Sequence, residues 1–130
     1  MIEPARIVRN RRILLIEDQP AVAATLVQLL RLDGHHVDLA RDGLEGLERV
    51  DAGEYDAILC DVRMPRLDGP GFYAALERTR PALVDRVAFI TADPGRQDVR
   101  EFFAAKRALW LPKPVALAEL RQLLGRLAGG

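Results

Sequence analysis

Five short apolar runs alternate with longer segments of helical periodicity along the chain. Apolar runs of this length, bounded by turn residues, are typical of strands buried on both faces of a parallel sheet. The run His36–Ala40 is the exception, because polar and apolar residues alternate in it. We predict strands at residues 12–16, 36–40, 57–60, 86–91 and 108–111.

The segments between these runs carry apolar residues three or four positions apart, which is the period of a helix with one buried face. Start and stop residues agree with this reading: Pro20 opens the first segment, Asp33-Gly34 closes it, and Pro81 ends the third. We predict helices at residues 20–32, 42–53, 72–80, 95–105 and 115–127.

Strict alternation of strand and helix defines the predicted fold class. Short connections of this kind are right-handed crossovers, which give a parallel sheet covered by helices on both faces. The chain is therefore predicted to be a doubly wound α/β domain. Of the two usual strand orders, five strands suit the flavodoxin-like order 2-1-3-4-5, which the family resemblance given below also implies. In that order the first and third strands are neighbours, so Asp18 and Asp61, which follow them, should lie close together.

Length and composition indicate one domain. With 130 residues, of which 49% are hydrophobic, the chain can build a single core. We assign residues 12–128 to this domain and residues 1–11, which are rich in arginine, to a solvated leader. His35 and His36 are interpreted as ordinary loop residues.

The balance of charge argues against two classes of partner. Lys and Arg number 19, as do Asp and Glu, so we expect neither nucleic acid nor a membrane surface to be a direct partner. No apolar run approaches the roughly 18 residues of a membrane span, and the start lacks a signal peptide. Cys60, the only cysteine, lies in a predicted core strand, which suits a reducing, cytoplasmic location.

Polar residues stand at the carboxyl ends of four predicted strands: Glu17 and Asp18, then Asp61, Thr91 and Lys113. Parallel strands bring these ends to one edge, where ligands of such sheets bind. Three carboxylates in one crevice repel each other unless a hard cation neutralises them. An all-oxygen set suits Mg²⁺, or Mn²⁺, rather than zinc.

This set of residues is equipped for phosphoryl transfer. Asp61 could attack phosphorus while a metal ion, Lys113 and Thr91 neutralise the oxygens, and the product would be an aspartyl phosphate. Each residue taken singly also has a plain structural reading. An acidic residue after a strand often caps a helix, and a strand-end threonine often reflects strand propensity.

Four ordered motifs make the chain resemble a response-regulator receiver domain of bacterial two-component signalling, over residues 12–128. The motifs are Ile-Leu-Leu-Ile-Glu17-Asp18, Asp-Ala-Ile-Leu-Cys-Asp61-Val-Arg-Met-Pro-Arg-Leu-Asp-Gly, Phe-Ile-Thr91-Ala92 and Leu-Pro-Lys113-Pro114. The resemblance implies that Asp61 is the phosphoryl acceptor. It also implies that Glu17, Asp18, Asp61 and the backbone carbonyl of Arg63 hold the Mg²⁺.

The same resemblance assigns Thr91 as the switch hydroxyl and Lys113 as the cation that pairs with phosphate, with a cis bond between Lys113 and Pro114. Trp110 stands where the family has its aromatic switch partner. It is either that partner or a fixed core or interface aromatic, being larger than the usual Tyr or Phe. Arg63 and Asp93 occupy variable positions beside the phosphoryl group, where their opposite charges could pair and restrict access of water.

The function implied is a phosphorylation-operated switch rather than an enzyme with an external substrate. A histidine kinase or histidine phosphotransfer protein would phosphorylate Asp61, and the surface of the last two helices and the strand between them would then engage a downstream protein target. The domain could be free-standing or part of a hybrid histidine kinase. Alternatives are a receiver-like scaffold without phosphoryl transfer and, on the same fold, a flavin-binding electron carrier.

Overall fold

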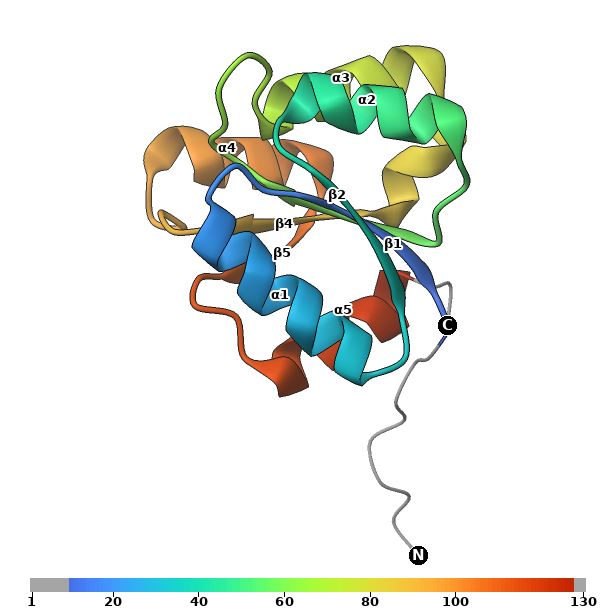
Figure 1. The fold of residues 1–130 in the computed structure, drawn as a ribbon. Helices are drawn as coiled ribbons and strands as arrows, with labels where there is room; N and C mark the ends of the chain where they lie inside the picture. The colour runs from blue at the N-terminus through green and yellow to red at the C-terminus, as the bar shows by residue number, and fades with distance from the viewer. Residues whose placement is uncertain (1–9, 128–130) are drawn as a thin grey trace, which may run out of the picture.

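A five-stranded parallel sheet forms the centre of the protein in a computed structural model, which describes residues 10–127 (Figure 1). The strand order is β2-β1-β3-β4-β5, so the predicted fold class is confirmed. The strands are β1 (Arg12–Ile16), β2 (His36–Ala40), β3 (Ala57–Asp61), β4 (Val87–Thr91) and β5 (Leu109–Pro112). Most of the predicted leader, residues 1–9, lies outside the described residues.

Helices cover both faces of this sheet. Figure 1 shows α1 and α5 on one face, with α2, α3 and α4 on the other. The helices are α1 (Pro20–Leu32), α2 (Gly43–Ala52), α3 (Gly69–Thr79), α4 (Gln97–Lys106) and α5 (Leu117–Leu127). Of the helices described within residues 10–127, none is long and apolar enough to cross a lipid bilayer.

Two hydrophobic cores follow from this arrangement, one on each face of the sheet. Alternate residues of β1 separate into them: Leu14 and Ile16 pack with α2, α3 and α4, whereas Ile13 and Leu15 pack with α1 and α5. Every residue of β3 is buried, including Asp61 at its end. The carboxylate is therefore held at the end of a fully buried strand.

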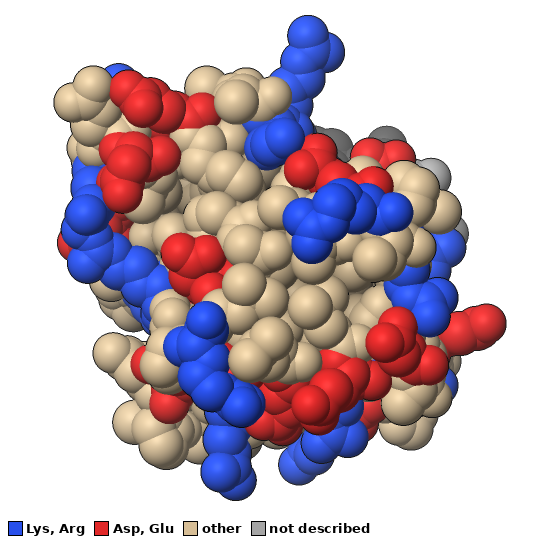
Figure 2. Space-filling view, turned by 90° about the horizontal axis from the view of Figure 1, so that it is seen from above, with Lys and Arg blue, Asp and Glu red and all other residues tan. Residues whose placement is uncertain are grey.

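Charged side chains of both signs lie next to one another on the face formed by α2 and α3. Figure 2 views the molecule from that side and shows them around a largely uncharged centre. This mixture agrees with the zero net charge of the whole sequence.

The predicted start of the third helix was wrong by three residues. We predicted residue 72, reading Gly69-Pro70-Gly71 as a turn, but α3 begins at Gly69. The carboxylate of Asp68 accepts a hydrogen bond from the Gly71 amide (2.8 Å) and so caps the helix. Proline is well suited to a first helical turn because its missing N–H would have no partner there. A 3₁₀ helix, Pro81–Arg86, also precedes β4 and was not predicted.

His35 is a buried residue rather than an ordinary loop residue, whereas His36 is exposed at the start of β2. The Nδ1 atom of His35 accepts a hydrogen bond from the Arg11 amide (3.2 Å), and its Nε2 atom has no partner in the structure. Burial lowers the pKa of the imidazole, an effect that Arg11 reinforces and Asp33 opposes. His35 is consequently held neutral in the folded protein.

This burial predicts a dependence of stability on pH. The unfolded chain binds a proton at His35 near pH 6.5, and the folded chain binds it only at lower pH. The contribution of His35 to the free energy of unfolding should therefore be complete above about pH 7 and fall as the pH drops below 6.5. Urea unfolding between pH 5 and 8 should show a shallower acid loss in His35→Asn. The His36→Asn variant should retain the wild-type profile, and equal profiles for all three proteins would contradict the prediction.

A second prediction concerns the close contact between α3 and β3. A Cβ atom on Gly69 would lie 2.5 Å from the backbone oxygen of Asp61, whereas Gly95 has nothing within 4 Å. We expect Gly69→Ala to lower the free energy of unfolding by about 2 kcal/mol, because backbone atoms must shift. Gly95→Ala should change it by less than about 1 kcal/mol. Urea unfolding of both variants is the measurement, and equal effects would contradict the prediction.

Candidate functional site

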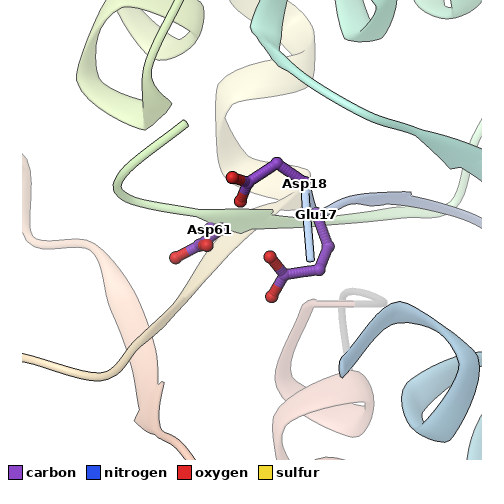
Figure 3. A group of neighbouring side chains, drawn as sticks. All are labelled: Glu17, Asp18 and Asp61. Atoms are coloured by element: carbon purple, nitrogen blue, oxygen red, sulfur yellow. The ribbon is translucent and has the colours of Figure 1, made fainter. Parts of the chain in front are cut away.

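Three carboxylates meet at the carboxyl edge of the sheet, as Figure 3 shows. Glu17 and Asp18 follow β1 and Asp61 ends β3; one ligand atom of each lies within 4.8 Å of the others. The neighbouring strands β1 and β3 cause this arrangement, because Ile16 pairs with Cys60 and the acidic residues follow on both. The expected proximity of Asp18 to Asp61 is therefore present.

The ammonium group of Lys113 bridges two of these carboxylates. Its Nζ atom lies 2.6 Å from Oε1 of Glu17 and 3.0 Å from Oδ2 of Asp61. The pairing of Thr91 with Pro112 places Lys113 directly after the end of β5 and next to the acidic residues. The Lys113–Pro114 peptide bond is cis, as the family resemblance implies.

Burial and mutual repulsion shape the electrostatics of the pocket. Burial raises the pKa of Glu17, and the charge of Asp61 adds to this, although the ion pair with Lys113 opposes it. The pKa of Asp18 is also raised, by burial and by its neighbour Glu17. Burial alone would lower the pKa of Lys113, but its bonds to Glu17 and Asp61 raise it. The negative charge of the carboxylates in the pocket thus favours a positively charged group beside them.

Both carboxylate oxygens of Asp61 already have donors. Oδ1 accepts a hydrogen bond from the Val62 amide (2.8 Å), while Oδ2 faces Lys113. The hydroxyl of Thr91 is buried and accepts a hydrogen bond from the Asp93 amide (3.1 Å). Within residues 10–127, no hydrogen bond joins Thr91 to Asp61. The structure therefore places Thr91 at the same edge of the sheet but not hydrogen-bonded to the carboxylate.

Trp110 lies on the partly exposed side of β5. Its side chain stacks on Phe103 of α4 with ring centroids 5.4 Å apart, and Phe103 in turn lies against Phe89 of β4. Trp110 is 39% exposed, so its ring covers the core without being enclosed by it. Both interpretations offered by the sequence, a switch residue and an interface aromatic, are compatible with this position.

The expected pairing of Arg63 with Asp93 is not found. Both side chains are exposed, and no ion pair in the described part of the chain joins them. A pair that sequence analysis did not anticipate lies nearby: Arg66 donates from Nε to Oδ2 of Asp42 at 2.6 Å. Arg66 has a positive φ of 64°, a conformation that an arginine in a sequence does not reveal.

The donor set of the pocket suits a hard divalent cation. All three clustered groups are carboxylates, and neither histidine nor cysteine belongs to the cluster. Oxygen ligands of this kind favour Mg²⁺ or Mn²⁺ over zinc. Burial is the main cause of the raised pKa values of Glu17 and Asp18, and the neighbouring carboxylates add to it; a bound cation would relieve this second contribution.

The open parallel sheet and the acidic pocket at the carboxyl ends of β1 and β3 define the class: a flavodoxin-like α/β domain with a carboxylate cluster at the edge of its sheet. The response regulator receiver domain family matches residues 13–125. The chain therefore belongs to that family and is a receiver domain, a phosphoacceptor module of two-component signalling. Receiver domains are phosphorylated by histidine kinases.

A curated relative is the transcriptional regulatory protein TcrA of Mycobacterium tuberculosis, which is 36% identical over 128 residues. The alignment covers 82% of this chain and 50% of TcrA. Response regulator MprA of Mycobacterium leprae is 38% identical over 120 residues, covering 84% of this chain and 47% of that protein. The chain thus spans about half the length of these curated relatives.

Among solved structures, the receiver domain of sensor histidine kinase PA1611 from Pseudomonas aeruginosa has a TM-score of 0.83 and 32% sequence identity. The superposition covers 93% of this chain and 99% of the PA1611 receiver domain. That structure was solved with a magnesium ion coordinated in the active site cleft. Similarity therefore extends both to response regulators and to the receiver of a sensor kinase.

The ion pairs of Lys113 predict its effect on stability. The Lys113→Met variant leaves Glu17 and Asp61 buried without their shared cation, so in metal-free buffer at pH 7 the free energy of unfolding should fall by about 3 kcal/mol. The loss should shrink as the pH is lowered, because Glu17, whose pKa is raised, then takes up a proton. Urea unfolding at several pH values measures both effects.

Lys106→Met is the matched control, since Lys106 pairs with Glu77 on the surface and should contribute less than about 1 kcal/mol. Equal losses in the two variants would show that the bridging position of Lys113 has no special energetic role.

Proposed function

We propose that this receiver domain accepts a phosphoryl group on Asp61 from the phosphohistidine of a histidine kinase or histidine phosphotransfer protein, in a reaction that requires Mg²⁺. One observation supports this above the others. The ammonium of Lys113 lies within 3.0 Å of Asp61 and contacts Glu17, beside a carboxylate pair suited to a cation. The lysine, the proposed phosphoryl acceptor and the proposed carboxylate ligands of the cation thus lie close together.

In the proposed reaction, a carboxylate oxygen of Asp61 attacks phosphorus. The phosphorus–nitrogen bond of the donor breaks, and its electron pair remains on the histidine nitrogen. The Val62 amide holds one oxygen of Asp61 at 2.8 Å, so the carboxylate is oriented before the donor arrives. Burial at the end of β3 limits its motion further.

Glu17, Asp18, Asp61 and the backbone carbonyl of Arg63 are the groups proposed to hold Mg²⁺, with Mn²⁺ as a substitute. When bound, the ion would supply positive charge next to the phosphoryl oxygens. Lys113 is proposed to pair with one of these oxygens, and the Thr91 hydroxyl to donate a hydrogen bond to another. The hydroxyl now accepts a hydrogen bond from the Asp93 amide, and this leaves its own proton for donation, so the proposed change is a movement of Thr91 toward Asp61.

This change at Thr91 is the proposed start of the switch. Thr91 ends β4, and Phe89 of the same strand lies against Phe103, on which Trp110 stacks. A shift at the end of β4 would therefore be passed by direct packing contacts to the surface formed by α4, β5 and α5. We propose that this surface engages the downstream protein target.

A groove between α1 and the segment after β5 gives the donor a place to approach. It has a volume of about 510 Å³ and is lined mainly by apolar residues of α1 together with Lys113, Pro114 and Val115. We propose residues 12–128 as the receiver unit and residues 1–11 as a leader. The unit could act alone, within a longer response regulator or in a hybrid histidine kinase, and a cytoplasmic location suits each of these.

Phosphoryl transfer can be tested with a small donor. Incubated with acetyl phosphate and Mg²⁺, the wild-type protein should gain the mass of one phosphoryl group, whereas Asp61→Asn should gain none. Chelation of Mg²⁺ should abolish the gain in the wild type. Intact-protein mass spectrometry gives the stoichiometry, and the fluorescence of Trp110, the only tryptophan, reports the proposed switch in the same samples.

Asp93→Asn is the control, because it removes an exposed carboxylate close to the site and should leave the mass gain intact. A wild-type protein that gains no mass would overturn the proposal in favour of a scaffold without phosphoryl transfer. A gain that persists in Asp61→Asn would place the acceptor elsewhere.

A further inference from the structure

The loop between β3 and α3 begins directly after Asp61, the last residue of β3. It contains Arg63, whose carbonyl is proposed to bind the cation. Its two ends are tied together by a hydrogen bond from the Gly69 amide to the Val62 carbonyl (2.8 Å). Between these ends the loop is exposed at Arg63, Pro65 and Arg66. The fixed ends alone therefore do not determine where the middle of the loop lies.

The middle of the loop contains an unfavourable turn at Arg66. The Leu67 amide donates to the Pro65 carbonyl at 2.7 Å, which closes a turn of three residues, and Arg66 at its centre has φ of 64°. Turns of this hand are rare and strained, and a side chain makes the left-handed region costly. Such a conformation persists only where surrounding contacts impose it.

Those contacts come from the start of α2. Arg66 donates from Nε to Oδ2 of Asp42 at 2.6 Å, and the other oxygen of Asp42 accepts a hydrogen bond from the Glu45 amide at 2.9 Å, which caps α2. The side chain of Asp42 is only 7% exposed, although that of Arg66 is 59% exposed. The ion pair therefore differs from an ordinary surface pair, because one partner is fixed in the fold and shielded from water.

A second contact lies beside the ion pair. The Gly43 amide donates to the Leu67 carbonyl at 2.9 Å, and a Cβ atom on Gly43 would lie 2.5 Å from that same oxygen. The start of α2 thus approaches the loop as closely as a backbone can. Two adjacent residues of the loop, Arg66 and Leu67, are bound to Asp42, which caps α2, and to Gly43, its first residue.

We propose that Arg66 is a positioning residue for the cation site: by pairing with Asp42 it holds the β3–α3 loop against α2 and so fixes the place of the Arg63 carbonyl. This inference rests on the proposed function. Arg66 acts through the loop and does not touch the cation. The ion pair offsets the strain at Arg66, and the loop is ordered before a cation arrives.

The test measures Mg²⁺ affinity directly, by calorimetric titration of the unphosphorylated protein with Mg²⁺ alone. Arg66→Ala should weaken binding roughly tenfold. Asp42→Asn should weaken it similarly, because asparagine still caps α2 but cannot form the ion pair. The double variant should bind no more weakly than either single variant, since both changes remove one interaction. Fully additive losses would overturn the proposal.

Two further variants separate the ion pair from other effects. Arg80→Ala removes an arginine that pairs with Asp51 at the other end of the α2–α3 layer, and it should leave Mg²⁺ affinity unchanged. Arg66→Gly relieves the backbone strain but also removes the guanidinium, so it should bind as weakly as Arg66→Ala. Wild-type affinity in Arg66→Gly would show that turn conformation alone matters, which would overturn the role of the ion pair.

Urea unfolding without metal supplies the readout for a merely structural role. If Arg66→Ala lowers stability but binds Mg²⁺ with wild-type affinity, Arg66 stabilises the fold and does not position the site. A wild-type protein that binds no Mg²⁺ would instead overturn the proposed function together with this inference. The two failures are therefore distinguishable.

Discussion

The bridging of Glu17 and Asp61 by Lys113 is the interaction on which the site depends. Carboxylates at the ends of adjacent strands are a cost to folding, because burial removes them from water and places like charges together. One ammonium group within 3.0 Å of two of them offsets part of that cost. Parallel pairing of β4 with β5 places Lys113 at this edge of the sheet. The contact of Lys113 with Asp61, which lies 52 positions earlier in the sequence, therefore follows from sheet topology.

Because Lys113 neutralises the carboxylates only in part, the pocket can still respond to an added cation or phosphoryl group. Lys113 supplies one positive charge to a group of three carboxylates, and the pKa values of Glu17 and Asp18 remain raised. If fixed cationic side chains neutralised all three carboxylates, the pocket would not attract a further cation. A divalent cation, or a phosphoryl group on Asp61, would change the local charge and require Lys113 to divide its contacts differently. The same shortage of positive charge would thus serve both the proposed binding of a cation and the proposed switch.

The strands and their order could be predicted from the sequence because they depend on local patterns. Apolar runs located four strands and an alternating pattern located the second, while the order of the strands in the sheet came in part from the family resemblance. Helix starts were less accurate: α3 begins at Gly69 because Asp68 caps it and because the small residue fits against β3, whereas glycine and proline in a sequence suggest a turn. Burial of His35 likewise depends on packing that no local pattern encodes.

The site shows the same division between topology and side-chain contact. Strand ends indicated which polar residues would meet, and the carboxylate cluster is present, while the roles assigned to its members stay predictions. The charges of Arg63 and Asp93 suggested an ion pair, yet Arg66 is the arginine that binds a carboxylate. Charge alone cannot distinguish them, because the choice depends on backbone direction within the loop. Arg66 combines a left-handed backbone with the contact to Asp42, and the adjacent bond from Gly43 to Leu67 supports the same turn. If Arg66 positions the loop as proposed, helix α2, which contributes no carboxylate to the cluster, is part of the architecture that shapes the site.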